Sequence, residues 1–207
     1  LPNTQRSIAT VAAPDGETFR TLFSSPLSSL RLFFSGKNFV TFTKASAQSS
    51  GYGFLVDSAS GAFEQILGPL KGLSVLPSPK GTYVFYTYAL GSSLRSELLT
   101  LSDRFSKAIP IGTLSEKCVW TADESSLYCA VPRAVSGTLP DDWYQGALSF
   151  SDRIWRIDLD GRVAVLVVDP KTVGNVEVDA VNLSVDSESN ILIFTNKKDG
   201  SLWAYDL

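Results

Sequence analysis

A hairpin pattern recurs along the chain at a nearly constant spacing. In each copy, a short apolar strand is followed by a polar turn and by a second strand rich in aromatic or β-branched residues. The first turn position falls at Ser35, Ser78 and Thr121, 43 residues apart, and then at Asp186 after one longer interval of 65 residues. The four copies read LRLFFSGKNFVTFT (30–43), LSVLPSPKGTYVFYT (73–87), KCVWTADESSLYCAV (117–131) and VNLSVDSESNILIFTN (181–196).

A second hairpin pattern alternates with the first, and Gly and Asp in its turns favour tight chain reversal. Its copies cover 8–23, 52–67, 97–111 and 153–168, and the final SLWAYDL begins another. Two hairpins per unit give four strands in about 43 residues, which is typical of a β-propeller blade. Apolar residues are spaced by two or run continuously, so the pattern does not favour helices, and a β-sandwich would not explain the period.

We therefore predict an all-β fold, a β-propeller of four-stranded antiparallel blades, with about four to five blades in this chain. The chain is either a single β-propeller domain or a propeller half. In the second case it is part of a six- to eight-bladed ring and needs further blades or a partner to complete it. The expected units are a partial blade at 1–28, blades at 29–71, 72–114 and 115–178 (with an insert at 132–152), and a partial blade at 179–207.

The segment SPKGTYVFY (78–86) resembles the S-P-D-G-x-x-I-x-F hairpin of WD40-like, TolB-type propeller repeats, with Lys80 in place of the usual Asp. The other copies match more loosely. The segments LPDDWYQGALSFSDRIWRIDLDG and DAVNLSVDSESNILIFTNKKDGSLWAYDL resemble the C-terminal half of uncharacterised, membrane-anchored bacterial propeller proteins. The resemblance implies an extracytoplasmic location, in the bacterial cell envelope or secreted, and allows for an anchor upstream of Leu1.

Composition excludes several kinds of chemistry. The chain contains no histidine, which excludes Ser-His-Asp and Cys-His catalysis and histidine metal sites. A net charge of −3 and a pI of about 5.0 argue against nucleic-acid binding. The chain has no apolar run of 18 residues, so we expect no membrane span within it. It also lacks a P-loop, a G-x-G-x-x-G fingerprint, a G-x-S-x-G elbow and a D-x-D-x-D-G calcium loop, so we assign no cofactor and no metal.

The two cysteines, Cys118 and Cys129, lie on the two strands of the third hairpin. If Asp123 and Glu124 form its apex, the cysteines are directly opposed, and their Cα atoms come within disulfide range. Two cysteines without histidine are too few for a zinc site, and their spacing does not fit a redox C-x-x-C pair. We predict a disulfide, which would indicate an oxidising compartment. The alternative is a pair of buried free cysteines in a cytosolic core.

The longer third interval corresponds to an insert of about 22 residues, PRAVSGTLPDDWYQGALSFSD, directly after the cysteine hairpin. Long loops in compact domains are often functional. The adjacent Asp141, Asp142, Trp143 and Tyr144 are therefore candidate partner-binding residues, because exposed aromatic rings beside acids suit a protein or glycan contact. In the alternative interpretation, the two aromatic rings fold back over an apolar blade edge.

The repeat architecture without a catalytic motif favours a non-catalytic scaffold or binding module at the bacterial cell envelope. Its partner would be a protein, peptide or glycan. The alternative function is a carboxylate-dependent hydrolase or lyase acting on polysaccharide, for which the recurring turn acids would supply the chemistry. We assign no catalytic residue. The turn acids are Asp15, Asp57, Asp103, Asp158, Asp160 and Asp186.

Overall fold

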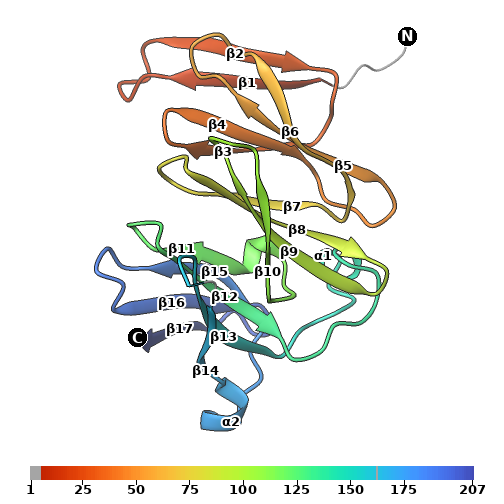
Figure 1. The fold of residues 1–207 in the computed structure, drawn as a ribbon, viewed down its shortest axis with the longest axis vertical. Coiled ribbons are helices and arrows are strands. Elements are labelled where there is room, and N and C mark those ends of the chain that lie inside the picture. The colour runs from red at the N-terminus through yellow and green to blue at the C-terminus, as the bar shows by residue number, and fades with distance from the viewer. Residues whose placement is uncertain (1–5, 162) are drawn as a thin grey trace.

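The computed structural model describes residues 6–161 and 163–207 as five consecutive antiparallel sheets (Figure 1). The first sheet is a two-stranded hairpin, and the last sheet has three strands. Together with the complete blades between them, they confirm the predicted all-β propeller arrangement. The strands of the two outer sheets are β1 (Ser7–Ala12) and β2 (Phe19–Ser25), then β15 (Ala180–Val185), β16 (Ile191–Asn196) and β17 (Leu202–Asp206).

Three complete blades lie between the outer sheets, and in each of them the four strands pair in chain order. The first contains β3 (Leu30–Ser35), β4 (Asn38–Thr43), β5 (Ser50–Val56) and β6 (Phe63–Lys71). The second contains β7 (Ser74–Pro77), β8 (Tyr83–Leu90), β9 (Ser93–Thr100) and β10 (Ser106–Ile109). The third contains β11 (Cys118–Trp120), β12 (Ser126–Pro132), β13 (Asp152–Asp158) and β14 (Val163–Val168).

Helical structure in the described residues is confined to three short segments in the connections. The 3₁₀ helix η1 (Ser115–Lys117) precedes β11, α1 (Asp141–Tyr144) lies in the insert, and α2 (Pro170–Gly174) follows β14. Asp169 caps α2 by accepting a hydrogen bond from the backbone N–H of Thr172, which satisfies one free donor of the first turn. Each segment is too short to bury a face of its own, so the fold is held by the sheets.

The recurring turn position has one role in three of the four hairpins. The side chains of Ser78, Thr121 and Asp186 each accept a hydrogen bond from the backbone N–H five residues later, at 2.9, 3.1 and 2.8 Å. Each bond satisfies a donor at the start of the second strand and closes the turn. The 43-residue period therefore marks a repeated hydrogen-bonding device. As predicted, the first pattern forms strands one and two of a sheet, and the second pattern forms the following strands.

Adjacent sheets pack face to face through apolar clusters. Phe42 of one blade packs with Val75 and Val84 of the next, and Phe85 packs in turn with Trp120 and Leu127. Each complete blade thus buries both of its faces, which is why its strands carry apolar residues on both sides of the pleat. The core of the molecule is therefore a series of inter-sheet layers.

The strand connections divide the molecule into two faces (Figure 1). We call one the turn face, because it carries the β7–β8, β11–β12 and β15–β16 turns. We call the opposite one the insert face, because it carries the connection between β12 and β13 that contains α1. In Figure 1 the β11–β12 and β15–β16 turns project to the left, and α1 lies toward the right.

The first and last sheets lie toward opposite ends of the molecule in Figure 1. Within the described residues, β1 pairs only with β2, and β17 pairs only with β16. The unit boundaries and the number of blades in the intact ring stay predictions. Among the residues that the structure describes, no helix has the length and apolar character that a membrane span requires.

Candidate functional site

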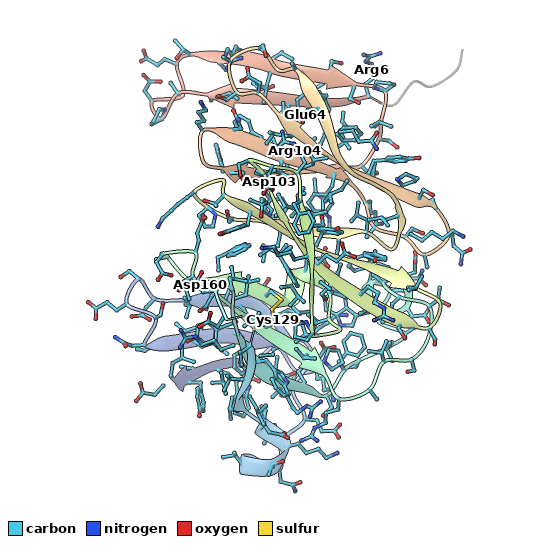
Figure 2. The ribbon with its side chains drawn as sticks, viewed as in Figure 1. Arg6, Glu64, Asp103, Arg104, Cys129 and Asp160 are labelled. Carbon is cyan, nitrogen blue, oxygen red and sulfur yellow. A yellow bond between two sulfur atoms is a disulfide. The ribbon has the colours of Figure 1, made fainter. Side chains whose placement is uncertain are left out.

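The cysteine hairpin has the predicted register. Cys118 pairs directly with Cys129, Trp120 pairs with Leu127, and the two sulfur atoms form a disulfide. Both cysteines are buried in the layer between the second and third blades, and Figure 2 shows the bridge at Cys129 inside the fold. The disulfide therefore links the first residue of β11 to β12, the strand that leads into the insert.

The insert leaves β12 after Pro132, returns at Asp152, and folds against the propeller. Trp143 is only 5% exposed and packs in a cluster with Leu114, Leu139 and Phe150. The burial of the Trp143 ring agrees with the alternative interpretation, in which the aromatic rings of the insert fold back over the propeller. So short a segment cannot form an apolar core of its own, so the apolar side chains of the insert pack with Leu94 of β9 and Val181 of β15 instead.

A buried ionic cluster anchors the insert. Lys117 Nζ lies 2.6 Å from Asp179 Oδ1 and 2.8 Å from Asp152 Oδ2, and all three side chains are fully buried. Asp179 Oδ2 also accepts hydrogen bonds from the Trp143 indole N–H (3.0 Å) and the Phe150 backbone N–H (3.1 Å). A buried charge is tolerated only when it is paired and hydrogen-bonded, and Asp179 meets both conditions.

The two acids of the cluster differ in their environments. Burial raises the pKa of Asp152 to about 6, although Lys117 acts in the opposite direction, and the Asp152 Oδ1 atom is buried without a partner among the described residues. Burial also acts to raise the pKa of Asp179. There the charge of Lys117 and the hydrogen bonds outweigh it, so the net pKa is lowered. The cluster thus favours an ionised Asp179, and Asp152 is the acid that takes up a proton first.

The other three candidate residues of the insert also make contacts within the chain. The Tyr144 hydroxyl donates a hydrogen bond of 2.9 Å to Glu116 Oε1, which also pairs with Arg31 of the first blade. Asp141 Oδ2 accepts from the Ala47 backbone N–H at 2.6 Å, and Asp142 Oδ2 accepts from that of Thr138 at 2.7 Å. The bonds of Asp141 and Tyr144 attach α1 to the first blade, that of Asp142 lies within the insert, and Asp179 and Lys197 attach α1 to the last sheet. Direct contact of the four residues with a partner stays a prediction.

Turn acids such as Asp57 and Asp186, and likewise Asp123 of the third hairpin, accept hydrogen bonds from their own turns. Asp57 Oδ1 and Asp123 Oδ1 accept from the backbone N–H groups of Ser60 and Ser125, at 2.7 and 3.0 Å. Hydrogen bonds from Ser60 lower the pKa of Asp57, and those from Thr121 and Ser125 lower that of Asp123 to about 2. Both carboxylates are therefore ionised and committed to turn geometry.

Two adjoining cavities open on the turn face and in the groove beside it. The first is polar, about 580 Å³, and lies among the β7–β8, β11–β12 and β15–β16 turns. The second, of about 410 Å³, lies between β14 and the end of β17 and is mainly apolar. Tyr128 and Arg156 line both cavities. Among the described residues, no group of three or more His, Cys, Asp or Glu side chains is arranged to hold a metal ion.

Neither the Lys117–Asp152–Asp179 cluster nor the pair formed by Tyr128 and Arg156 was predicted from the sequence. A lysine beside Cys118 at the start of an apolar hairpin was the available signal for the first. The partners of Lys117 lie on segments that only the folded chain brings together. For the second, the signal was Arg156 at a strand position that other units fill with glycine or leucine.

Comparison with protein-family models and with curated proteins finds no match. Solved structures do match. TolB from Acinetobacter baumannii has a TM-score of 0.62 at 16% identity over 96% of this chain and 46% of its own. The β-propeller domain of the Trilobed protease from Pyrococcus furiosus has a TM-score of 0.63 at 13% identity, over 99% and 62%. An oligogalacturonate lyase in complex with manganese has a TM-score of 0.65 at 9% identity, over 96% and 53%.

The chain thus spans about half to two thirds of the length of these structures. At such identities the likeness concerns the fold alone. One of the matched proteins is named as a lyase and another as a protease, whereas TolB carries neither name. The chain therefore has the β-propeller fold that is found in TolB and in other repeat proteins of this kind.

Proposed function

We propose that the chain is a non-catalytic β-propeller binding module outside the bacterial cytoplasm, at the cell envelope or secreted, and that its partner is a protein, peptide or glycan. The proposal rests on the difference between the insert face and the turn face. The insert covers one face through contacts within the chain, whereas the turn face has an open polar cavity. A rigid scaffold with one covered and one open face suits recognition at the open face.

The disulfide supports the proposed location. Cys118 and Cys129 are bonded to each other inside the fold, and such bonds persist in secreted and periplasmic proteins. The likeness to TolB is consistent with this location at the level of the fold.

The roles of the carboxylates support binding over catalysis. A general acid needs a raised pKa and access to a substrate. The pKa values of Asp57, Asp123 and Asp186 are lowered by hydrogen bonds within their turns. Asp152 has a raised pKa, but its side chain is fully buried in the ionic cluster. None of these carboxylates therefore combines a raised pKa with access to a substrate, as a general acid must.

Binding from envelope extract, with a variant on each face, tests the proposal. The immobilised chain is expected to retain a specific partner, and Lys80→Glu, which reverses a charge in the polar cavity, is expected to weaken retention. Gln145→Arg changes an exposed residue beside α1 and serves as the insert-face control. It also tests the predicted contact of Asp141, Asp142, Trp143 and Tyr144. Loss of binding in Gln145→Arg alone would place the contact on the insert face.

A polysaccharide substrate screen addresses the alternative function. We expect no new reducing ends and no unsaturated products when the chain is incubated with acidic and neutral polysaccharides. Turnover that is retained by a heat-treated sample would indicate a contaminant. Turnover that is lost only when the chain is unfolded would contradict the proposal in favour of a hydrolase or lyase.

A further inference from the structure

A third cavity opens on the turn face, between the first and second blades. It has a volume of about 570 Å³ and lies among the β3–β4, β7–β8 and β9–β10 turns. Both blades contain four strands, so the cavity lies between two complete sheets. A cavity of this size can hold a small ligand or one group of a larger ligand. The charged residues of its lining are Lys37 and Arg104, and no acid of the described chain lines it.

Arg104 occupies a turn position that two other sheets fill with glycine. In the β9–β10 turn its backbone N–H donates to the Thr100 carbonyl at 3.0 Å, and its φ is 59°. Gly61 in the β5–β6 turn and Gly200 in the β16–β17 turn donate in the same way to the residue four positions earlier, at 2.9 and 2.8 Å, with φ of 73° and 75°. Side chains other than that of glycine are disfavoured in this left-handed region. The geometry of the turn therefore does not account for an arginine.

Arg104 forms an ion pair with Glu64 of β6 (Figure 2). Its Nε and Nη2 donate to Glu64 Oε1 at 3.0 and 2.7 Å, and Nη2 also donates to Oε2 at 2.7 Å. The two side chains are 38% and 57% exposed, and exposed ion pairs contribute little to stability. The pair fixes the orientation of the guanidinium, whose Nη1 makes no hydrogen bond within the described residues. This donor is therefore available to a ligand.

Lys37 supplies the second cation of the cavity. It is exposed in the two-residue turn between β3 and β4, and none of the ion pairs formed among the described residues includes it. Thr82 and Ser102 add exposed hydroxyl groups to the lining. Three turns thus direct an ammonium group, a guanidinium and two hydroxyl groups toward one cavity.

Two acids of adjoining turns, Asp57 and Asp103, are bound within their own turns. Their Oδ1 atoms accept from backbone N–H groups at 2.7 and 3.0 Å. Hydrogen bonds within the turn are the main cause of the lowered pKa of Asp57, and the charge of Lys37 is a minor one. Among the residues that the structure describes, Glu64 is the one acid that pairs with a cation of the lining. The lining therefore favours a negatively charged ligand group.

We propose that this cavity binds an oxyanion, a carboxylate or a phosphate group, between Lys37 and Arg104. The inference rests on the proposed binding function and names the chemical group that the ligand presents to the turn face. Lys37 Nζ and Arg104 Nη1 pair with oxygen atoms of the anion, and the Thr82 and Ser102 hydroxyls donate to it. Charged N–H donors form strong hydrogen bonds with carboxylate and phosphate oxygens. Glu64 holds the guanidinium in place and also competes with the ligand for it.

Titration of the isotope-labelled chain with inorganic phosphate or with glucuronate, followed by NMR of the backbone amides, tests the inference. Chloride keeps the ionic strength constant, and glucose is the neutral control. Saturable shifts are expected at the amide signals of Thr82 and Ser102 with at least one of the two anions, and not with glucose. Tighter binding of phosphate would identify a phosphate ligand, and tighter binding of glucuronate would identify a carboxylate ligand.

Arg104→Gly separates binding from stability. The variant is expected to bind the preferred anion about tenfold more weakly, because it loses one charge-assisted contact. Its unfolding midpoint in urea should stay the same or rise, because glycine suits a φ of 59°. Lys37→Gln is expected to weaken the anion in the same way. Arg95→Gln, at an exposed arginine of β9 that does not line this cavity, is the matched control and should bind like the unmodified chain.

Glu64→Gln tests the competing charge. The glutamine oxygen still accepts from the guanidinium, but the negative charge is removed, so the anion is expected to bind several-fold more tightly. Unchanged or weaker binding in this variant would contradict an anion contact at Arg104. A lower unfolding midpoint of Arg104→Gly together with unchanged anion binding would assign Arg104 to stability alone and overturn the inference.

Two further outcomes would overturn the inference. One is the absence of a saturable shift with either anion. The other is an equal loss of binding in Arg95→Gln and Arg104→Gly, which would indicate general electrostatic attraction. The envelope-extract assay separates these outcomes from failure of the proposed function. A chain that binds neither anion but retains an envelope partner would exclude the oxyanion site and support the binding function. A chain that binds the anion but retains no partner would contradict the proposed function and support the site.

Discussion

At the scale of single residues, Lys117 is central to the contacts of the insert. Its ammonium group contacts two buried carboxylates, and it lies 5.1 Å from the centre of the Trp143 ring. Ser115 and Lys117 belong to η1, so a connection between two blades carries the charge that pairs with both acids. Replacing the ammonium would leave two buried carboxylates without a counter-ion.

Lys117→Met tests this role. We expect the free energy of unfolding to fall by about 3–5 kcal/mol, because the variant leaves buried charge uncompensated. Urea denaturation followed by circular dichroism measures the change. Lys171→Met removes an exposed lysine that pairs with Glu177 and should change stability by less than about 0.5 kcal/mol. Similar losses in the two variants would contradict a special role for the buried cluster.

The pKa of Asp152 predicts how stability depends on pH. In the folded chain it is raised to about 6, above the ordinary value of 3.8, so the folded state binds this proton more tightly than the unfolded state. The Asp152 contribution therefore makes the folded state more stable as the pH falls from about 7 to about 4. The unfolding midpoint in urea, measured for the unmodified chain and for Asp152→Asn, checks this. On acidification, the urea midpoint of the unmodified chain should rise relative to that of Asp152→Asn. A difference in midpoint that does not change with pH would exclude the raised pKa of Asp152.

At the scale of elements, the third hairpin and the insert form one connected unit. The disulfide links β11 to β12, Lys117 precedes β11, and Asp152 begins β13 at the far end of the insert. Both ends of the insert are thus anchored close to the cysteine pair. Because β11 has only three residues, few backbone hydrogen bonds hold it, and the covalent link adds to them.

Replacing both cysteines by alanine tests the contribution of the bridge. Closing so short a loop restricts the unfolded chain, and its removal should lower the free energy of unfolding by about 2–3 kcal/mol. Urea denaturation measures the loss. The unmodified chain after reduction controls for packing lost with the sulfur atoms, and it should unfold close to the double variant. An unfolding midpoint that does not change on reduction would contradict a stabilising disulfide.

At the scale of the whole molecule, the last of the five sheets has one apolar face that no other described sheet covers. Ile191, Ile193 and Leu202 are 44%, 40% and 75% exposed, and the pairing of β16 with β17 places them on one side of the sheet. The opposite side, with Leu192 and Phe194, packs on the third blade. In every complete blade the next sheet covers the equivalent face. The exposed face of the last sheet therefore resembles a surface that is normally buried between two sheets.

We therefore expect residues 1–207 to associate in solution through this face. Size-exclusion chromatography with light scattering should give a mass above 22.4 kDa that increases with concentration. Leu202→Glu should reduce association, because it replaces the most exposed of these three apolar side chains by a charge. Val173→Glu, at an isolated residue of α2 that is 79% exposed, is the control and should not. A mass of 22.4 kDa at all concentrations would show that the face does not self-associate.

The sequence by itself determined the hairpins, their order and the cysteine register. These features depend on a period of two and on a turn side chain such as Ser78 or Thr121 that bonds five residues ahead, so the information lies within about 15 residues. Only the tertiary structure decided that Trp143 is buried, that Lys117 meets Asp179 from 62 residues away, and that Arg156 faces a groove beside the last sheet. Those contacts depend on how the sheets stack, and stacking brings together segments whose separation in the sequence has no local signature.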